Sequence, residues 1–317
     1  MSSERLAIAL SAVLALAGCG NYSNSEVEFL NAIPSREDLK TNLPAGASTA
    51  KAAPGVVRAA LAPEIPALGL TSKLYENTQG ASDFFSAIAE FFVGLIDEVQ
   101  RVPPSEQGPD FRQWGPFQPG DLPNIQLRAV IQRDPALPTH YTYEFAFLKA
   151  GDAAWTPFLQ GSFDSSGQAR SGVGHLAFAN RALVLAGIQK DPGLQELDAL
   201  TIDYDNRADP KTVSTTFTFV AGAGALSSSH EDWADGRGTM AFDVDDWQQG
   251  ILLHVTSSWL QTGEGRADAL ISDTTGPLGS VAQCWDAGFL LTWHASTYEA
   301  PYLLGSESSC PAGLVTP

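Results

Sequence analysis

The sequence has 317 residues, of which 44% are hydrophobic and 17% are charged. This balance is typical of a folded globular protein and excludes a chain that is disordered throughout. Its formal net charge of −18 comes from 36 acidic and 18 basic side chains. Because such a field repels phosphate groups, we expect no nucleic-acid binding and no adhesion to anionic lipids through a basic patch.

The N-terminus has the features of a secretion signal. Arg5 precedes a small-apolar run from Leu6 to Leu16, which is too short for the roughly 20 apolar residues of a membrane-spanning helix. Glu4 leaves the positive charge ahead of this run weak. The run ends in a tetrapeptide of small and apolar residues before a cysteine, Leu16-Ala17-Gly18-Cys19.

This tetrapeptide resembles the lipobox of bacterial lipoproteins in all four positions. The resemblance implies that residues 1–18 are a signal peptide and that Cys19 carries lipid, palmitate included, which would make the membrane a partner through this anchor. Gly20 in place of an aspartate implies the outer membrane, with the folded part facing the periplasm. A plain secretion signal and a short buried helix are the alternatives. The resemblance covers 19 residues, so it indicates a destination in the cell envelope and no activity.

The remaining cysteines, Cys284 and Cys310, form an even pair once Cys19 is lipidated. In an oxidising compartment we expect a disulfide between them, closing a loop of about 27 residues and worth roughly 3–4 kcal/mol. Two unpaired buried thiols are the alternative. No pair of histidines lies near them at ligand spacing, so we expect no zinc site.

Residues 19–70 are rich in alanine, proline, serine, asparagine and glycine. Five prolines, at positions 34, 44, 54, 63 and 66, exclude a long helix in this segment. We expect mainly a flexible tether that holds the folded part away from the membrane. A short amphipathic turn around Val27 to Leu30 is a candidate for docking within it.

A helix is predicted over residues 82–101, with Ser82 or Asp83 as its N-cap and Pro103-Pro104 after its end. Apolar residues recur at helical spacing and form one wide stripe: Phe84, Phe85, Ile88, Phe91, Phe92, Leu95, Ile96 and Val99. This long amphipathic helix must cover a sheet, line a cavity or meet a partner, and core packing is the simplest expectation.

From residue 111 onward the sequence is typical of β-structure. Polar and apolar residues alternate in runs that turn residues separate at intervals of roughly 8–15 positions. The predicted strands are 124–133, 139–149, 155–163, 169–178, 197–205, 213–221, 236–244, 251–260, 265–272 and 288–296. Short connections favour antiparallel neighbours. We therefore predict an α+β fold that is mainly antiparallel β, in one domain over residues 71–317. It would be a curved meander forming a half-barrel, barrel or sandwich, with the helix on its concave face.

Paired glycines open several of these strands, as in Gly172-Val173-Gly174 and Gly236-Arg237-Gly238. We expect bulges or sharp bends there. A phosphate-binding loop is the alternative, which the missing third glycine, lysine and following helix disfavour.

Catalytic motifs are absent from the sequence: G-x-S-x-G, H-E-x-x-H and the P-loop do not occur. We expect no catalytic residue, no metal and no cofactor, although a carboxylate pair formed in space stays open. His254 and His294 lie in apolar strands and are candidates for an interior position. One acidic group brackets a predicted hairpin, either as a calcium site or as a solvated edge: Glu231, Asp232, Asp235, Asp243, Asp245 and Asp246.

Two functions are compatible with these sequence features. The first is a non-catalytic interaction or structural lipoprotein with an envelope protein as partner. The second is a carrier or binding module for a lipid-like ligand, because a helix on a curved sheet behind a lipidated tether is similar to the architecture of periplasmic lipoprotein carriers. The β-rich part also resembles uncharacterised envelope lipoproteins. Candidate ligand-binding residues are apolar and come from the helix and the last strand: Phe84, Phe85, Ile88, Phe92 and Trp293.

Overall fold

The computed structural model describes residues 24–40, 43, 66–100, 102–168, 170–190, 192–220, 225–246, 250–298 and 301–314. Within these ranges, the side chains of residues 24–26, 36, 87–93, 95–100, 193, 225 and 244–246 lie outside the description. The predicted signal peptide and Cys19 also lie outside the described residues, so the lipobox stays a prediction.

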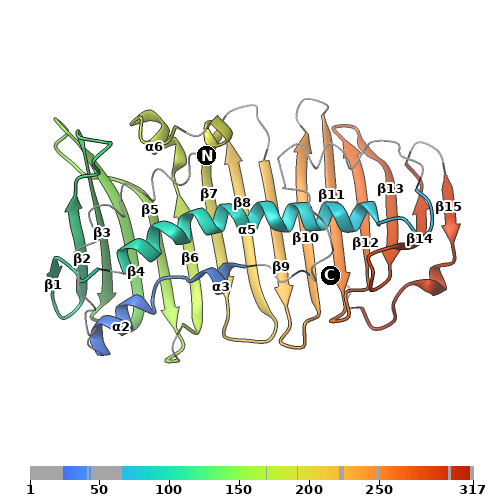
Figure 1. Cartoon of the computed structure of the whole chain (residues 1–317), viewed down its shortest axis with the longest axis horizontal. Helices are drawn as coiled ribbons and strands as arrows, with labels where there is room; N and C mark the ends of the chain where they lie inside the picture. The colour runs from blue at the N-terminus through green and yellow to red at the C-terminus, as the bar shows by residue number, and fades with distance from the viewer. Residues whose placement is uncertain are drawn as a thin grey trace. The chain divides into compact units, whose positions relative to one another are not determined.

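Fifteen strands form one open antiparallel sheet, in which the strand order follows the chain from β1 to β15 (Figure 1). The strands are Glu106–Gln107 (β1), Phe111–Phe117 (β2), Ile125–Asp134 (β3), Leu137–Lys149 (β4), Thr156–Ser165 (β5), Gly172–Phe178 (β6), Leu197–Asp205 (β7), Lys211–Phe219 (β8), Ala225–Asp232 (β9), Gly238–Asp246 (β10), Ile251–Trp259 (β11), Gly265–Asp273 (β12), Gly276–Trp285 (β13), Leu291–Ser296 (β14) and Tyr302–Gly305 (β15). The predicted antiparallel meander is confirmed. Because the strands form a single open sheet, neither a closed barrel nor a two-sheet sandwich describes it.

All ten predicted strands are present, and five others were missed. The missed strands are β1, β2, β9, β13 and β15. β9 is a polar run, Ala-Leu-Ser-Ser-Ser-His-Glu-Asp, and β13 contains Gly276, Pro277 and Gly279. Both are held by backbone pairing to neighbours on each side, which does not need alternating side chains. The last predicted strand, 288–296, is β14, which begins only at Leu291 after the turn that joins it to β13.

Contacts within the chain define two compact units. Unit 1 consists of Met1–Leu39, Ala89–Arg207 and Phe217–Val220, and unit 2 of Lys40–Ile88, Ala208–Thr216 and Ala221–Pro317. Two short helical segments, α6 (Asn180–Leu185) and η1 (Pro192–Leu194), connect β6 to β7 in unit 1, and η2 (Glu307–Ser309) follows β15 in unit 2. The single domain predicted over residues 71–317 stays a prediction.

In unit 1, helices α2 (Asn24–Leu30) and α3 (Arg36–Leu39) belong to the segment predicted to be a tether. Phe29 is 1% exposed, and its ring and that of Tyr141 form a T-shaped pair with centroids 5.7 Å apart. The Arg112 guanidinium lies over the Phe29 ring, 4.4 Å from its centroid. Tyr141 Oη donates to Glu28 Oε1 over 2.7 Å. Burial, then the hydrogen bond and charge of Glu28, raise the pKa of Tyr141 to about 12.

The tether prediction is therefore wrong for residues 24–39, where the amphipathic turn around Val27 to Leu30 docks on β4. The reason is apolar burial: Phe29, Ile33 and Leu39 are each at most 4% exposed, and removing these side chains from water holds the segment on the sheet.

In unit 2, the first half of helix α5 (Lys73–Gln100) packs on β11 and β13. Ser72 Oγ donates to Gln283 Oε1 over 2.8 Å, and the Leu74 amide donates to the same oxygen over 3.0 Å. Thr78 Oγ1 and Ser257 Oγ are 2.6 Å apart. The helix thus begins at Lys73, with Ser72 accepting from the Tyr75 amide as its cap.

The predicted start at residue 82 is wrong, and Ser82 is a buried residue inside the helix. Residues 73–81 have fewer apolar side chains than the predicted stripe. Buried Leu74, Tyr75 and Ala81, together with the side-chain bonds to the sheet, hold this part. Of the predicted stripe, Phe84 is half-buried and Phe85 is buried. The other members are outside the described side chains, so packing along the whole stripe stays a prediction.

Glycines in the strands lie opposite aromatic rings on neighbouring strands. In unit 1, Gly174 pairs with Tyr204, and in unit 2, Gly238 pairs with Trp259. A Cβ atom on Gly238 would lie 2.3 Å from Cζ2 of Trp259. The expected bulges are wrong, since the ladders through these glycines keep their register. The glycines instead leave room for rings to lie flat over the adjacent strand.

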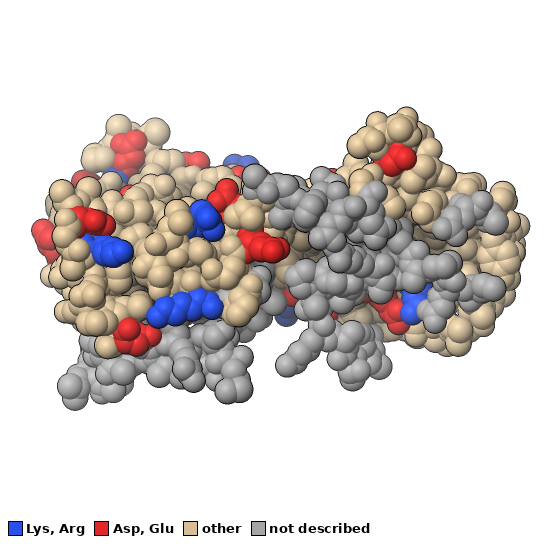
Figure 2. Space-filling view, turned by 90° about the horizontal axis from the view of Figure 1, so that it is seen from above, with Lys and Arg blue, Asp and Glu red and all other residues tan. Residues whose placement is uncertain are grey.

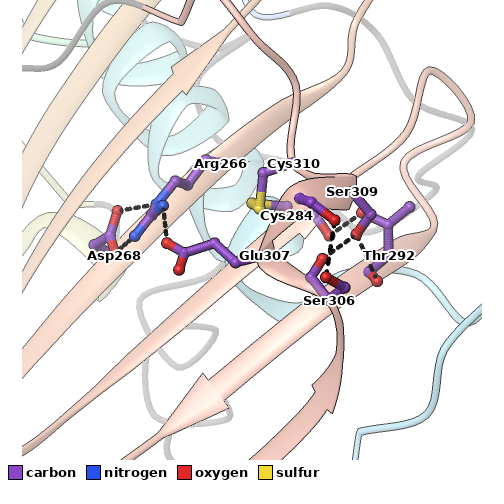
Figure 3. The surroundings of a disulfide bond; sticks show 9 residues. Arg266, Asp268, Cys284, Thr292, Ser306, Glu307, Ser309 and Cys310 are labelled. Carbon is purple, nitrogen blue, oxygen red and sulfur yellow. Dashed lines mark hydrogen bonds and ion pairs between the residues drawn. A yellow bond between two sulfur atoms is a disulfide. The ribbon is translucent and has the colours of Figure 1, made fainter.

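A disulfide between Cys284 and Cys310 joins β13 to the segment after β15, as predicted, with Cα atoms 5.3 Å apart. Figure 3 shows Arg266 beside it, bonded to both Asp268 and Glu307. Ser309 Oγ donates to the carbonyl of Thr292 over 3.1 Å. The C-terminal segment is therefore attached to the sheet by one covalent bond and by polar contacts on both sides of it.

Candidate functional site

A groove of about 660 Å³ lies on the sheet of unit 1. Its lining comes from strands β1 to β5: Glu106, Phe111, Gln113, Arg128, Val130, Gln132, Thr142, Tyr143, Glu144, Gln160 and Gly161. This volume falls in the range of small-molecule sites, roughly 300–1,000 Å³. The groove is therefore large enough to accept a ligand.

Strand alternation explains which side chains line the groove. In β4 the buried residues Tyr141, Tyr143 and Phe145 share the face that α2 contacts, so Thr142 and Glu144 point to the opposite side. We call this opposite side of β1–β5 the polar face. The register aligns one row across all five strands, namely Glu106, Gln113, Val130, Glu144 and Gln160.

A network of charged and amide groups holds the groove floor. Arg128 Nη2 donates to Glu144 Oε1 over 3.1 Å, and Gln160 Nε2 donates to Glu144 Oε2 over 3.4 Å. The Arg128 guanidinium also lies 4.6 Å from the ring centroid of Trp155. With side-chain exposures of 28% for Arg128 and 31% for Glu144, the pair is partly shielded from water, and its fixed geometry positions the side chains around it.

Charge on the drawn surface is mixed rather than concentrated. In the view of Figure 2, acidic and basic side chains of the described residues lie singly or as neighbours of opposite sign. Within the groove the charged residues are Glu106, Glu144 and Arg128, which leaves a small negative excess. An anionic ligand would therefore meet no favourable field there.

The structure does not bring the predicted ligand-binding residues together. Phe84 and Phe85 meet edge-on in α5, with centroids 5.7 Å apart. Trp293 lies on β14 under the Arg266 guanidinium, 5.2 Å from its ring centroid. The next residue, His294, bonds Gln283 on the face that α5 contacts, so Trp293 is on the opposite face. The side chains of Ile88 and Phe92 are outside the description.

Three of the five histidines form cross-strand pairs with an aspartate directly opposite. The pairs are His140–Asp164 at 2.7 Å, His175–Asp203 at 2.7 Å and His254–Asp243 at 2.5 Å. His254 is therefore exposed and paired with Asp243, so the interior position considered for it is wrong. His294 is buried, as considered, and burial lowers its pKa.

The described members Asp232, Asp235 and Asp243 of the acidic group near β9 and β10 have separate partners. Asp243 bonds His254, Asp235 bonds Arg237, and Asp232 lies buried on β9 at 3.7 Å from Lys211 Nζ. The side chains of Asp245 and Asp246 lie outside the description. Among the residues that the structure does describe, no three histidine, cysteine or acidic side chains converge as metal ligands.

His230 predicts a pH dependence of stability. Burial and then the charge of Lys211 lower its pKa to about 3, from 6.5 in the unfolded chain. The unfolded chain thus binds a proton that the folded protein rejects, so stability is fully present above pH 6.5 and falls as the pH decreases toward 3. Between pH 7 and pH 5 we expect a loss of about 2 kcal/mol from this residue, which urea unfolding of the wild type and His230→Gln would measure.

His140→Gln is the comparison variant, because it removes a histidine that is only half-buried and paired with Asp164. The pH dependence of stability should be flatter for His230→Gln than for the wild type or His140→Gln. Equal slopes for all three proteins would contradict the assignment.

The groove residues were not identified as a site from the sequence. Gln132, Thr142 and Glu144 stand at the polar positions of two predicted strands, so their exposure was predictable. Their alignment with Gln113 and Gln160 depends on the register of four neighbouring strands, of which the first was not recognised.

No helix in the described part of the chain is long and apolar enough to cross a membrane. No protein-family model matches this chain, and neither the curated proteins nor the solved structures contain a significant match. The site must therefore be interpreted from its own chemistry.

Proposed function

We propose that this chain is a lipoprotein of the bacterial cell envelope, anchored through Cys19 to the outer membrane, whose folded part is a non-catalytic binding module. The observation that carries the binding role is the groove on the polar face of unit 1. It has the volume of a ligand site and a floor already ordered by Arg128, Glu144 and Gln160. Preordered polar groups lower the entropy lost on binding.

The disulfide supports the envelope destination. Disulfides persist in secreted and periplasmic proteins and are rare where thiols are kept reduced. Cys284 and Cys310 are joined, which leaves Cys19 as the third cysteine of the sequence. This is the arrangement expected if Cys19 has a separate role as the lipidated residue.

The groove favours recognition over the alternative of a lipid-like ligand. Carriers of apolar ligands need walls that are mainly hydrophobic, whereas this groove has seven polar or charged residues, Glu106, Gln113, Arg128, Gln132, Thr142, Glu144 and Gln160. Both oxygens of Glu144 accept hydrogen bonds from protein side chains, which suits a carboxylate that orders a site. The lipid-carrier function is therefore not favoured by any described contact.

Fractionated cells test the proposal. Cys19→Ser should release the mature protein from the membrane fraction into the soluble envelope fraction, and Ser11→Ala, which leaves the tetrapeptide intact, should not. A photo-reactive residue at position 132 in the groove should cross-link an envelope component. The same residue at position 126, on the same strand and face but outside the groove, is the control.

Unchanged membrane partition of Cys19→Ser would contradict the anchor. Equal cross-linking from positions 132 and 126, or none from either, would contradict a binding role for the groove.

A further inference from the structure

We propose that the ligand of this groove is an uncharged, polyhydroxylated chain, that is, a neutral glycan. This inference rests on the proposed binding function and names its ligand class. It follows from four properties of the polar face: the chemistry of its side chains, their spacing, their lack of partners and their charge.

Side-chain chemistry is the first property. Gln113, Gln132 and Gln160 each present one amide oxygen as acceptor and one NH₂ group as donor, and Thr142 presents a hydroxyl. A sugar hydroxyl both donates and accepts a hydrogen bond. Planar amides that offer a donor and an acceptor side by side can therefore bind two adjacent hydroxyls of one ring. Half-buried Phe111 adds an apolar surface suited to the C–H face of a sugar ring.

The spacing of these groups is regular. Neighbouring strands lie about 4.8 Å apart, and side chains on one face recur about every 6.8 Å along a strand. The register places Gln113 and Glu144 in one row, and Phe111, Gln132 and Thr142 in the next. Such a lattice offers repeated contacts to an extended chain with repeating units.

The side chains of Gln113, Gln132 and Thr142 are not committed to other protein groups. Over the ranges that the structure describes, none of the three makes a side-chain hydrogen bond with the protein, whereas Gln160 already contacts Glu144. Three side chains are thus available to hydrogen-bond a ligand, next to the ordered network of Arg128, Glu144 and Gln160. This combination is the one expected of a preorganised site.

The charge and the backbone exclude other ligand classes. Glu106 and Glu144 outnumber Arg128, so an anionic polymer would be repelled, as it is by the net charge of −18. An extended peptide typically binds a sheet at its edge through free backbone groups. The backbone groups of β3 and β4, in the middle of the groove, are paired on both sides within the sheet, so a ligand that lies across them meets side chains.

Calorimetry on the purified full mature chain tests this inference. The probes are hexasaccharides of β-1,4-linked glucose, xylose and N-acetylglucosamine, with an anionic hexagalacturonate and a flexible decapeptide of glycine, serine and asparagine as comparisons. At least one neutral hexasaccharide should bind. The Gln113→Ala, Gln132→Ala double variant should bind this hexasaccharide about tenfold more weakly. Gln126 is an exposed glutamine on the same strand and face as Gln132 but outside the groove, so Gln126→Ala should bind with the affinity of the wild type.

Tighter binding of the decapeptide or the hexagalacturonate than of every neutral hexasaccharide would overturn the proposal of a neutral glycan. A neutral hexasaccharide that binds the double variant as tightly as the wild type would also overturn it. The proposed function fails by a different result, namely the loss of position-specific cross-linking at residue 132 in cells. If cross-linking at residue 132 persists and no neutral sugar binds, the ligand class is wrong and the binding function stands.

Discussion

Trp259→Ala is expected to lower the free energy of unfolding of unit 2 by about 3 to 5 kcal/mol, the usual loss for a buried aromatic residue. The Trp259 side chain is 2% exposed, and the residue pairs with Gly238 on β10 and with Gly265 on β12. With glycine at both cross-strand positions, no side chain directly opposite can move in to fill the space that the ring leaves. We expect the loss at the upper end of this range, measured by urea unfolding and by hydrogen exchange of β10–β12 amides.

Gly238→Ala tests the cause of this loss. The three atoms nearest to an added Cβ all belong to the Trp259 ring, the closest at 2.3 Å. Overpacking of this kind costs typically 1–3 kcal/mol. In the Trp259→Ala background the same substitution should cost little, because the obstructing ring is gone. A purely additive double variant would contradict the pairing of ring and glycine.

Reduction of the Cys284–Cys310 disulfide is expected to lower the free energy of unfolding by about 3 to 4 kcal/mol. The two cysteines are 26 residues apart in sequence, and Cys284 is fully buried. Much of the stabilisation comes from limiting the unfolded chain. The exposed ion pair of Arg266 with Glu307 contributes about 0–1 kcal/mol, so it cannot replace the covalent bond.

Thermal unfolding with and without dithiothreitol measures this effect. The wild type should lose stability on reduction, and the double variant Cys284→Ala, Cys310→Ala should be less stable and insensitive to the reductant. A wild type whose complete reduction is verified by mass, yet whose unfolding temperature does not change, would contradict the prediction.

Local sequence determined most of the strands and the disulfide. Runs such as Tyr141 to Phe147 alternate polar with apolar residues, and this period requires a sheet with two different faces. The cysteine pair followed from the even number that Cys19 leaves. Strands β9 and β13 were not predictable, because their polar residues, glycines and proline are held by pairing with neighbouring strands.

The helical parts show the same division. The apolar stripe after residue 82 predicted a helix, whereas the turns from Lys73 onward depend on Gln283 and Ser257, which lie about 180 to 210 residues away. Likewise, the burial of Phe29 depends on its contacts with Tyr141 and Arg112, which lie far away in the sequence.

For the candidate site, the sequence by itself determined which side chains are polar and which face of a strand they share. The tertiary structure decided their alignment, because a groove across β1–β5 exists only when the four registers between these strands agree. A shift of one residue in any strand would turn its polar side chains to the other face. The field of the net charge acts at long range, so the sequence already argued against nucleic acids and anionic lipids as ligands before the fold was known. Recognition acts at contact distance, so its residues became visible only when the strands were in place.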